Sequence, residues 1–148
     1  MGTIGAGDKI KEENFEISCI YPIKGRRTED KNNSSTVLQV SYQDFSMLLS
    51  GDLGFDGEEE LLQMGALRAV DVWKVSHHGS KYSGSENFLQ SINPQLSLIS
   101  VGRNSYGHPN EELLERIHAV GSMAETTLEH GALMIESDGK TFSLSFGR

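Results

Sequence analysis

The segment Leu96–Val101, with the sequence LSLISV, is nearly continuously apolar. A strand of this composition needs cover on both faces, as in the parallel sheet of an α/β protein. Helical segments flank it, because Ser85 can cap a helix that Pro94 stops, and Pro109 at a first helical position opens another that Gly121 closes. This alternation of strands and helices predicts an α/β layered fold.

The remaining elements follow from periodicity and turn residues. Residues 15–21 alternate between apolar and polar, which is typical of a half-buried strand. Gln43-Asp44 and Asp138-Gly139 each separate two strand-like runs and predict hairpins. The further strands that we predict are 36–42, 45–50, 71–75, 132–136 and 141–146.

Residues 57–67 predict a helix with an acidic start. We interpret Glu58, Glu59 and Glu60 as matching the positive end of the helix dipole, not as a metal cluster. The lone cysteine, Cys19, lies between apolar neighbours and is expected to be a buried strand thiol.

Length and composition predict a single domain over residues 1–148. The 36% hydrophobic content and the absence of an apolar run of about 20 residues predict a soluble chain. A net charge of −8 argues against a surface that coats nucleic acid, since such a surface needs Lys and Arg to displace phosphate counterions. It does not argue against a nuclease whose metal ions supply the positive charge.

Unusual polar residues follow the apolar strands, where side chains can be directed into a shared cleft. The first motif is Ser50-Gly51-Asp52. An Asp at a strand end can cap the next turn. An isolated Gly-Asp pair would be interpreted as such a structural cap, not as part of a functional site.

The second motif is Ser76-His77-His78-Gly79-Ser80. Adjacent histidines point to opposite sides of an extended backbone, so we expect one to face the cleft and the other to orient it. An imidazole together with a carboxylate from another strand end makes half of a metal site of the zinc or manganese type.

The third motif, Asn104-Ser105-Tyr106-Gly107-His108-Pro109, lies between a strand and a helix. His108 can hydrogen-bond an anionic group or donate a proton to a leaving oxygen. The alternative is a loop histidine that only packs against Pro109.

Taken in order, these motifs, with Asn32-Asn33-Ser34-Ser35 before them, resemble the C-terminal metallo-β-lactamase-fold domain of ComEC-type DNA-uptake (competence) proteins. The resemblance runs from about Gly7 to the end of the chain. It implies an αββα fold with mixed sheets and flanking helices, of which this chain resembles the C-terminal half.

The resemblance also implies residue roles and a cofactor. Asp52 resembles the carboxylate that bridges two divalent metal ions, Zn or Mn, and His77 or His78 resembles the last ligand, with His77 preferred. His108 resembles a catalytic residue that contacts the substrate phosphate or the leaving group. Asn33, Ser34 and Ser80 are expected to lie beside the metals or to bind the substrate.

One departure limits this interpretation. The family carries its first metal ligands on a His-x-Asp-x-Asp-His loop, and the 148 residues hold no such motif. By resemblance, the full domain would be a nuclease or phosphodiesterase acting on DNA at the outer face of the membrane, joined to a membrane-embedded channel region. We expect this chain alone to bind metal weakly and to be inactive.

The alternative is a metal-free module of the same fold that binds a partner or forms a homo-oligomer. An exposed sheet edge and a missing helical layer would favour self-association.

Overall fold

A computed structural model of the chain describes residues 4–25 and 35–147. Within these ranges, strands β1 to β7 form one sheet in sequential order, and β8 and β9 pair as a separate hairpin. The strands are β1 (Lys9–Glu12), β2 (Phe15–Tyr21), β3 (Val37–Tyr42), β4 (Phe45–Leu49), β5 (Val72–Lys74), β6 (Leu96–Ile99), β7 (Met123–Thr126), β8 (Ala132–Ser137) and β9 (Phe142–Gly147). The helices are α1 (Phe55–Gln63), α2 (Glu86–Ile92), α3 (Glu111–Ala119) and the short α4 (Thr127–His130), with a 3₁₀ turn η2 (Ser76–Gly79).

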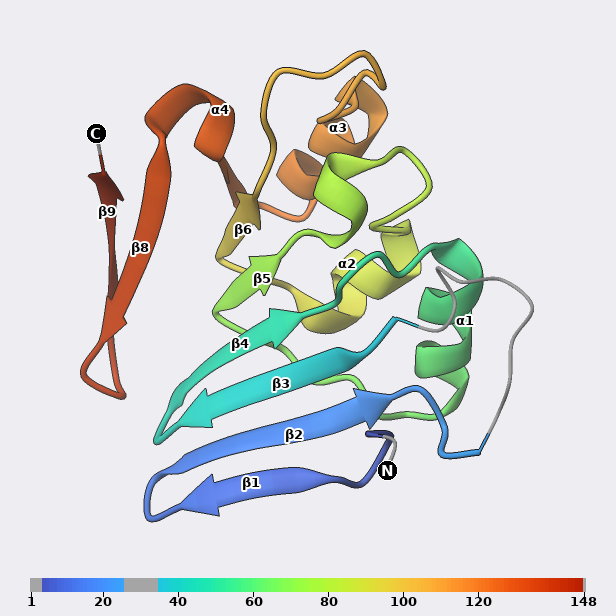
Figure 1. Cartoon of the computed structure of the whole chain (residues 1–148), viewed down its shortest axis with the longest axis vertical. Helices are drawn as coiled ribbons and strands as arrows, with labels where there is room; N and C mark the ends of the chain where they lie inside the picture. The colour runs from blue at the N-terminus through green and yellow to red at the C-terminus, as the bar shows by residue number, and fades with distance from the viewer. Residues whose placement is uncertain (1–3, 26–34, 148) are drawn as a thin grey trace.

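The sheet changes character at β4. Strands β1 to β4 form an antiparallel meander, whereas β4 to β7 run parallel and are linked by helical crossovers. Helices α1, α2 and α3 lie on one side of the sheet and the β8–β9 hairpin on the other (Figure 1). The predicted α/β class with a mixed sheet and flanking helices is confirmed.

Each face of the sheet has its own core. On the helical side, Trp73 is fully buried and packs edge-on against Phe88, with ring centroids 5.6 Å apart. On the other side, Val72, Leu96 and Leu98 pack against the hairpin. Strand β6 is buried at every residue, as its continuous apolar sequence predicted.

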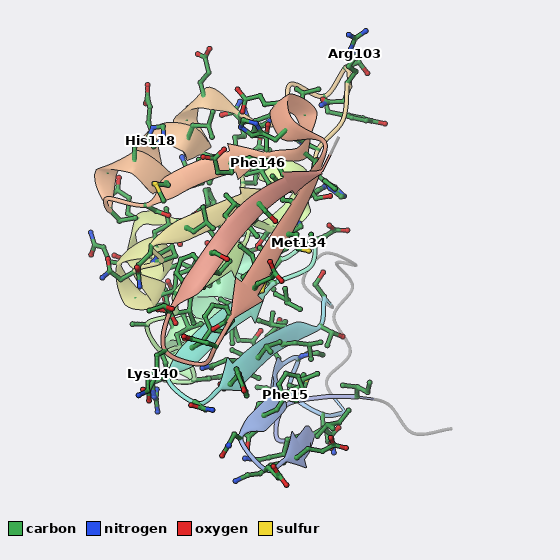
Figure 2. All side chains as sticks on the ribbon, turned by 90° about the vertical axis from the view of Figure 1, so that its left-hand side faces the viewer. Phe15, Arg103, His118, Met134, Lys140 and Phe146 are labelled. Atoms are coloured by element: carbon green, nitrogen blue, oxygen red, sulfur yellow. The ribbon has the colours of Figure 1, made fainter. Side chains whose placement is uncertain are left out.

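The hairpin is attached to the sheet through its turn. The Gly139 carbonyl accepts hydrogen bonds from the backbone N–H groups of Asp44 (2.8 Å) and Phe45 (3.1 Å). Asp44 lies in the β3–β4 turn and Phe45 begins β4, so the two hairpins predicted from sequence contact each other. Figure 2 shows β8 and β9 crossing in front of the sheet.

Three helix boundaries differ from the prediction, and the first is the start of α1, which is Phe55 instead of Gly57. Helix α1 ends before Gly65, whose φ of 62° is incompatible with a continuing helix. Pro109 does not occupy the first helical position of α3: Asn110 is the N-cap, and its side chain accepts a hydrogen bond from the Glu112 N–H. The Asn110 side chain accepts a hydrogen bond from the free Glu112 N–H in the first turn of α3, which the apolar side chain of a proline cannot do.

Glu58 has a role that the sequence did not indicate. It is fully buried, and its two carboxylate oxygens accept hydrogen bonds from the N–H groups of Gly84 (2.6 Å) and Ser85 (2.8 Å). Glu58, on α1, therefore holds the backbone at the start of α2. The predicted cap by Ser85 is wrong, because the Ser85 side chain makes no capping hydrogen bond. Burial raises the pKa of the Glu58 carboxyl, and the hydrogen bonds from Ser85 and Gly84 oppose that shift.

We predict that Glu58→Gln lowers the free energy of unfolding by about 1–3 kcal/mol, because an amide offers only one acceptor to two buried N–H groups. Glu59→Gln, on the exposed side of the same helix, is the matched control and should stay near wild type. Chemical denaturation of both variants checks this, and equal effects would contradict it.

The wild-type chain should also lose stability relative to Glu58→Gln as the pH rises from 4.5 towards the raised pKa. In that window the folded state holds a proton that the unfolded state has released.

Candidate functional site

The carboxyl ends of β4, β5 and β6 lie along one edge of the sheet, because these three strands are parallel neighbours. The segments that follow them are residues 50–52, η2, and residues 100–109. The strand-end motifs predicted to share a cleft are therefore neighbours in the fold.

A buried hydroxyl network joins the ends of β4 and β5. Ser50 Oγ donates to the Lys74 carbonyl (3.2 Å) and accepts from Trp73 Nε1 (2.9 Å). Ser76 Oγ lies 2.6 Å from Ser50 Oγ. Because the single Ser50 proton is directed to the carbonyl, Ser76 must be the donor in this pair. Both serines are fully buried, so the network fixes how the first two motifs meet.

Asp52 is exposed and held through its backbone. Its N–H donates to Ser35 Oγ (3.1 Å), and the preceding Gly51 carbonyl accepts from the His77 N–H (2.9 Å). This last bond places the Asp52 loop directly beside the histidine turn.

Lys74 adds a positive charge near Asp52. Burial lowers the pKa of the Lys74 ammonium, and the Asp52 carboxylate partly offsets this shift. The ammonium donates to the Val75 carbonyl at 2.9 Å.

The two histidines do not lie on an extended backbone, which corrects the reasoning from alternation. His77 and His78 have φ values of 49° and 53°, in the left-handed region, within η2. The ring of His77 faces that of His108, with centroids 5.9 Å apart and an interplanar angle of 70°.

His78 is oriented by a backbone carbonyl. Its Nδ1 lies 2.7 Å from the Ser100 oxygen. A carbonyl can only accept, so Nδ1 carries a proton, and in the neutral ring the lone pair is therefore on Nε2. Metal-binding and acid–base histidines are commonly oriented in this way.

His108 lies near the end of the third segment, directly before Pro109. Its Nδ1 is buried and has no hydrogen-bond partner among the described residues. It borders a pocket of about 430 Å³, which is lined by His78, Ser100, Val101, Gly102, Arg103, Asn104, Tyr106, His108 and Thr127.

Gly79 forms the contact between the histidine turn and this third segment. Its φ is 89°, and a Cβ there would lie 2.8 Å from Pro109 Cβ and 2.9 Å from Pro109 Cα. The Gly79 carbonyl also accepts from the Asn110 N–H at 2.9 Å. Only glycine permits this close approach.

The remaining candidate residues are Ser80, Asn33 and Ser34. Ser80 is 4% exposed, and its hydroxyl accepts from the Tyr82 N–H at 3.3 Å. Asn33 and Ser34 fall outside the described residues. Residues 4–25 and 35–147 contain no group of three or more His, Cys, Asp or Glu that could hold a metal ion.

Sequence reasoning missed Lys74 and Asn104. Lys74 could have been noticed as a charged residue inside an apolar strand. Asn104 belongs to the third motif, but its role was not predicted: its side chain hydrogen-bonds the backbone of Gly102, Tyr106 and His108, and this depends on how the loop folds back on itself.

Comparison with known proteins gives relatives over most of the chain, although no family model matches it. ComE operon protein 3 of Bacillus subtilis is 32% identical over 141 residues, which is 93% of this chain and 18% of that protein. Recombination protein 2 of Haemophilus influenzae is 35% identical over 73% of this chain and 14% of its own length. Competence protein ComA of Neisseria gonorrhoeae is 36% identical over 73% of this chain and 16% of its own length.

The chain belongs to the ComEC-type competence family. It spans less than a fifth of the length of these relatives. Among solved structures, a CmlA β-hydroxylase mutant superposes with a TM-score of 0.51 at 11% identity, over 82% of this chain and 31% of that one. That enzyme has a metallo-β-lactamase fold, which confirms the fold inferred from the motifs.

We predict that Gly79→Ala lowers the free energy of unfolding by about 1–3 kcal/mol, because it combines backbone strain with a clash against Pro109. Gly102→Ala in the adjacent loop is the control, since a Cβ there meets no atom within 4 Å. Thermal unfolding of the two variants checks the prediction, which fails if Gly79→Ala melts like wild type.

Proposed function

We propose that this chain supplies the C-terminal half of a metal-dependent nuclease or phosphodiesterase domain that acts on DNA during its uptake. The observation that carries the proposal is the hydrogen bond from the His77 N–H to the Gly51 carbonyl, which sets a carboxylate beside a histidine turn. The names of the relatives, a competence protein and a recombination protein among them, supply the biological context.

The proposed roles follow the donor chemistry. Asp52 is the carboxylate ligand of divalent zinc or manganese, and either His77 or His78 is the imidazole ligand. His77 lies beside the Asp52 loop through its backbone, whereas His78 has the fixed tautomer that ligation requires. His108 holds the substrate phosphate or protonates the leaving oxygen.

These residues fit part of a metal site, not a whole one. The described residues gather fewer than three ligands at any point, and the sequence contains no His-x-Asp-x-Asp-His loop. We therefore propose that the remaining ligands come from the other half of the domain. The complete site would use metal ions to acidify a bound water and to stabilise charge on the phosphoryl group.

The surroundings of the domain are a further part of the proposal. No helix among the described residues is long and apolar enough to cross a membrane. The relatives extend well beyond the matched region, and we propose that a membrane-embedded channel region belongs to the same polypeptide, with this domain on the outer face.

A second candidate function is a metal-free module that pairs with another copy of the chain. It is favoured by apolar side chains on edge strands, since Ile10 of β1 is 64% exposed and Phe146 of β9 is 51% exposed. A dimer in light scattering that Ile10→Lys converts to a monomer would support this candidate, and a wild-type monomer would contradict it.

We predict that Asp52→Asn in the complete domain lowers DNA cleavage with Mn²⁺ or Zn²⁺ by about 100-fold or more, because an amide is a poor bridging ligand. Asp44→Asn, an equally exposed change in the β3–β4 turn, should leave cleavage unchanged. Gel-based cleavage assays check this, and an Asp52→Asn enzyme with wild-type activity would refute the assigned role.

For the chain alone, we predict weak metal binding and no cleavage. Calorimetry with Zn²⁺ and Mn²⁺ measures the first, and cleavage assays measure the second. Tight stoichiometric binding, with a cleavage activity that Asp52→Ala abolishes, would overturn the view that the chain is half of a site.

A further inference from the structure

The pocket beside His108 has a composition unlike the rest of the chain. Its lining includes Arg103, His78 and His108 but no acidic residue, whereas the chain carries 21 acidic against 13 basic residues. The exposed lining is mainly apolar, and Arg103 is its one fixed charge, which favours a ligand that combines an apolar planar part with a negative group. The volume of about 430 Å³ is in the range of small-molecule pockets, which is about 300–1,000 Å³.

An exposed aromatic ring stands at the same pocket. Tyr106 is 81% exposed, the highest value among the large apolar or aromatic side chains of the described residues. Its ring lies 6.1 Å from that of His108 at an interplanar angle of 31°. The outer face of this ring is therefore open to a planar group, and nucleobases stack on such rings whatever their sequence.

The loop that carries these side chains is held in shape by Asn104. Its Nδ2 donates to the carbonyls of Gly102 and His108, both at 2.8 Å. Its Oδ1 accepts from the N–H groups of Tyr106 (3.0 Å) and His108 (3.1 Å). With all four hydrogen-bonding positions used, the loop is preorganised, so a ligand does not have to order it.

Arg103 lies on the same loop, on the other side of Asn104 from Tyr106. Figure 2 shows it at the outer end of the loop, away from the body of the molecule. Its guanidinium makes no hydrogen bond or ion pair with any residue of 4–25 and 35–147. A free guanidinium at that place suits a phosphate, which it can bind through two parallel hydrogen bonds.

We propose that this pocket binds an unpaired nucleotide of a DNA strand, with the base stacked on Tyr106 and the adjoining phosphate held by Arg103. The proposal rests on the function proposed above, which supplies DNA as the polymer. It adds a preference for single strands. A base inside a duplex is covered on both faces by its neighbours, so only an unpaired or terminal base can present a face to Tyr106.

The test measures binding, not cleavage. Fluorescence anisotropy of the chain is recorded in EDTA with labelled oligothymidylate and with a blunt duplex of the same length. The wild type is expected to bind the single strand at least about fivefold more tightly, which corresponds to one stacked base.

The variants separate stacking from charge. Tyr106→Ala should weaken single-strand binding by about five- to tenfold and leave duplex binding unchanged, whereas Tyr106→Phe should keep wild-type affinity. Arg103→Ala should weaken binding and reduce the slope of log affinity against log salt by about one. Tyr106 and Arg103 are both exposed, so these changes should leave the fold intact.

Matched controls lie outside the pocket. Tyr82→Ala and Arg68→Ala remove an exposed tyrosine and an exposed arginine elsewhere on the surface and should bind like wild type. Tyr106→Ala with wild-type affinity, Tyr82→Ala with an equal loss, or a wild type that binds neither oligonucleotide would each overturn the proposal.

The experiments can distinguish a failure of the proposed nuclease function from a failure of the proposed nucleotide pocket. If Asp52→Asn retains cleavage in the complete domain while Tyr106→Ala loses single-strand binding, the nuclease role fails and the nucleotide pocket stands. If Asp52→Asn abolishes cleavage while Tyr106→Ala binds normally, the pocket fails and the nuclease role stands.

Discussion

The relative placement of the Asp52 loop and the histidine turn depends on one buried hydroxyl group, that of Ser50. Ser50 Oγ receives hydrogen bonds from Trp73 and Ser76 and gives its own proton to the Lys74 carbonyl, so every bonding position of that oxygen is used. A buried polar group is tolerated only when it is satisfied in this way. The consequence is geometric, because β4 and β5 cannot slide relative to each other without breaking three bonds. The carboxylate loop and the histidine turn are therefore fixed in the same relation as the two strands.

The sheet and its strand-end motifs were predictable from local sequence. The burial of β6 followed from a continuous apolar run, and the two hairpins followed from turn residues. That the segments carrying Asp52, His77 and His108 follow neighbouring strand ends was expected from the rule that parallel strands end together. The resemblance to competence proteins then turned a set of individually weak motifs into a family assignment.

What escaped prediction depended on contacts between distant parts of the chain. Glu58 is one of three similar glutamates, and only the packing of α1 against the entry to α2 distinguishes it from Glu59. The left-handed conformations of His77 and His78 occur in a turn whose next residue, Gly79, packs directly against the distant Pro109. Periodicity reports how a segment repeats, and it carries no information about which distant backbone groups a side chain will meet.

The self-contained loop around Asn104 has an evolutionary consequence. Its shape is set by bonds among residues 102–108, not by the sheet beneath it. Side chains at its outer positions can therefore diverge without disturbing the strand ends that carry Asp52 and His77. Under the function proposed above, changes at Arg103 and Tyr106 would alter which polymer is accepted while Asp52 and His77 stay in place, whereas His108 belongs to the loop itself. A scaffold with this division can acquire new preferences by small, tolerated steps.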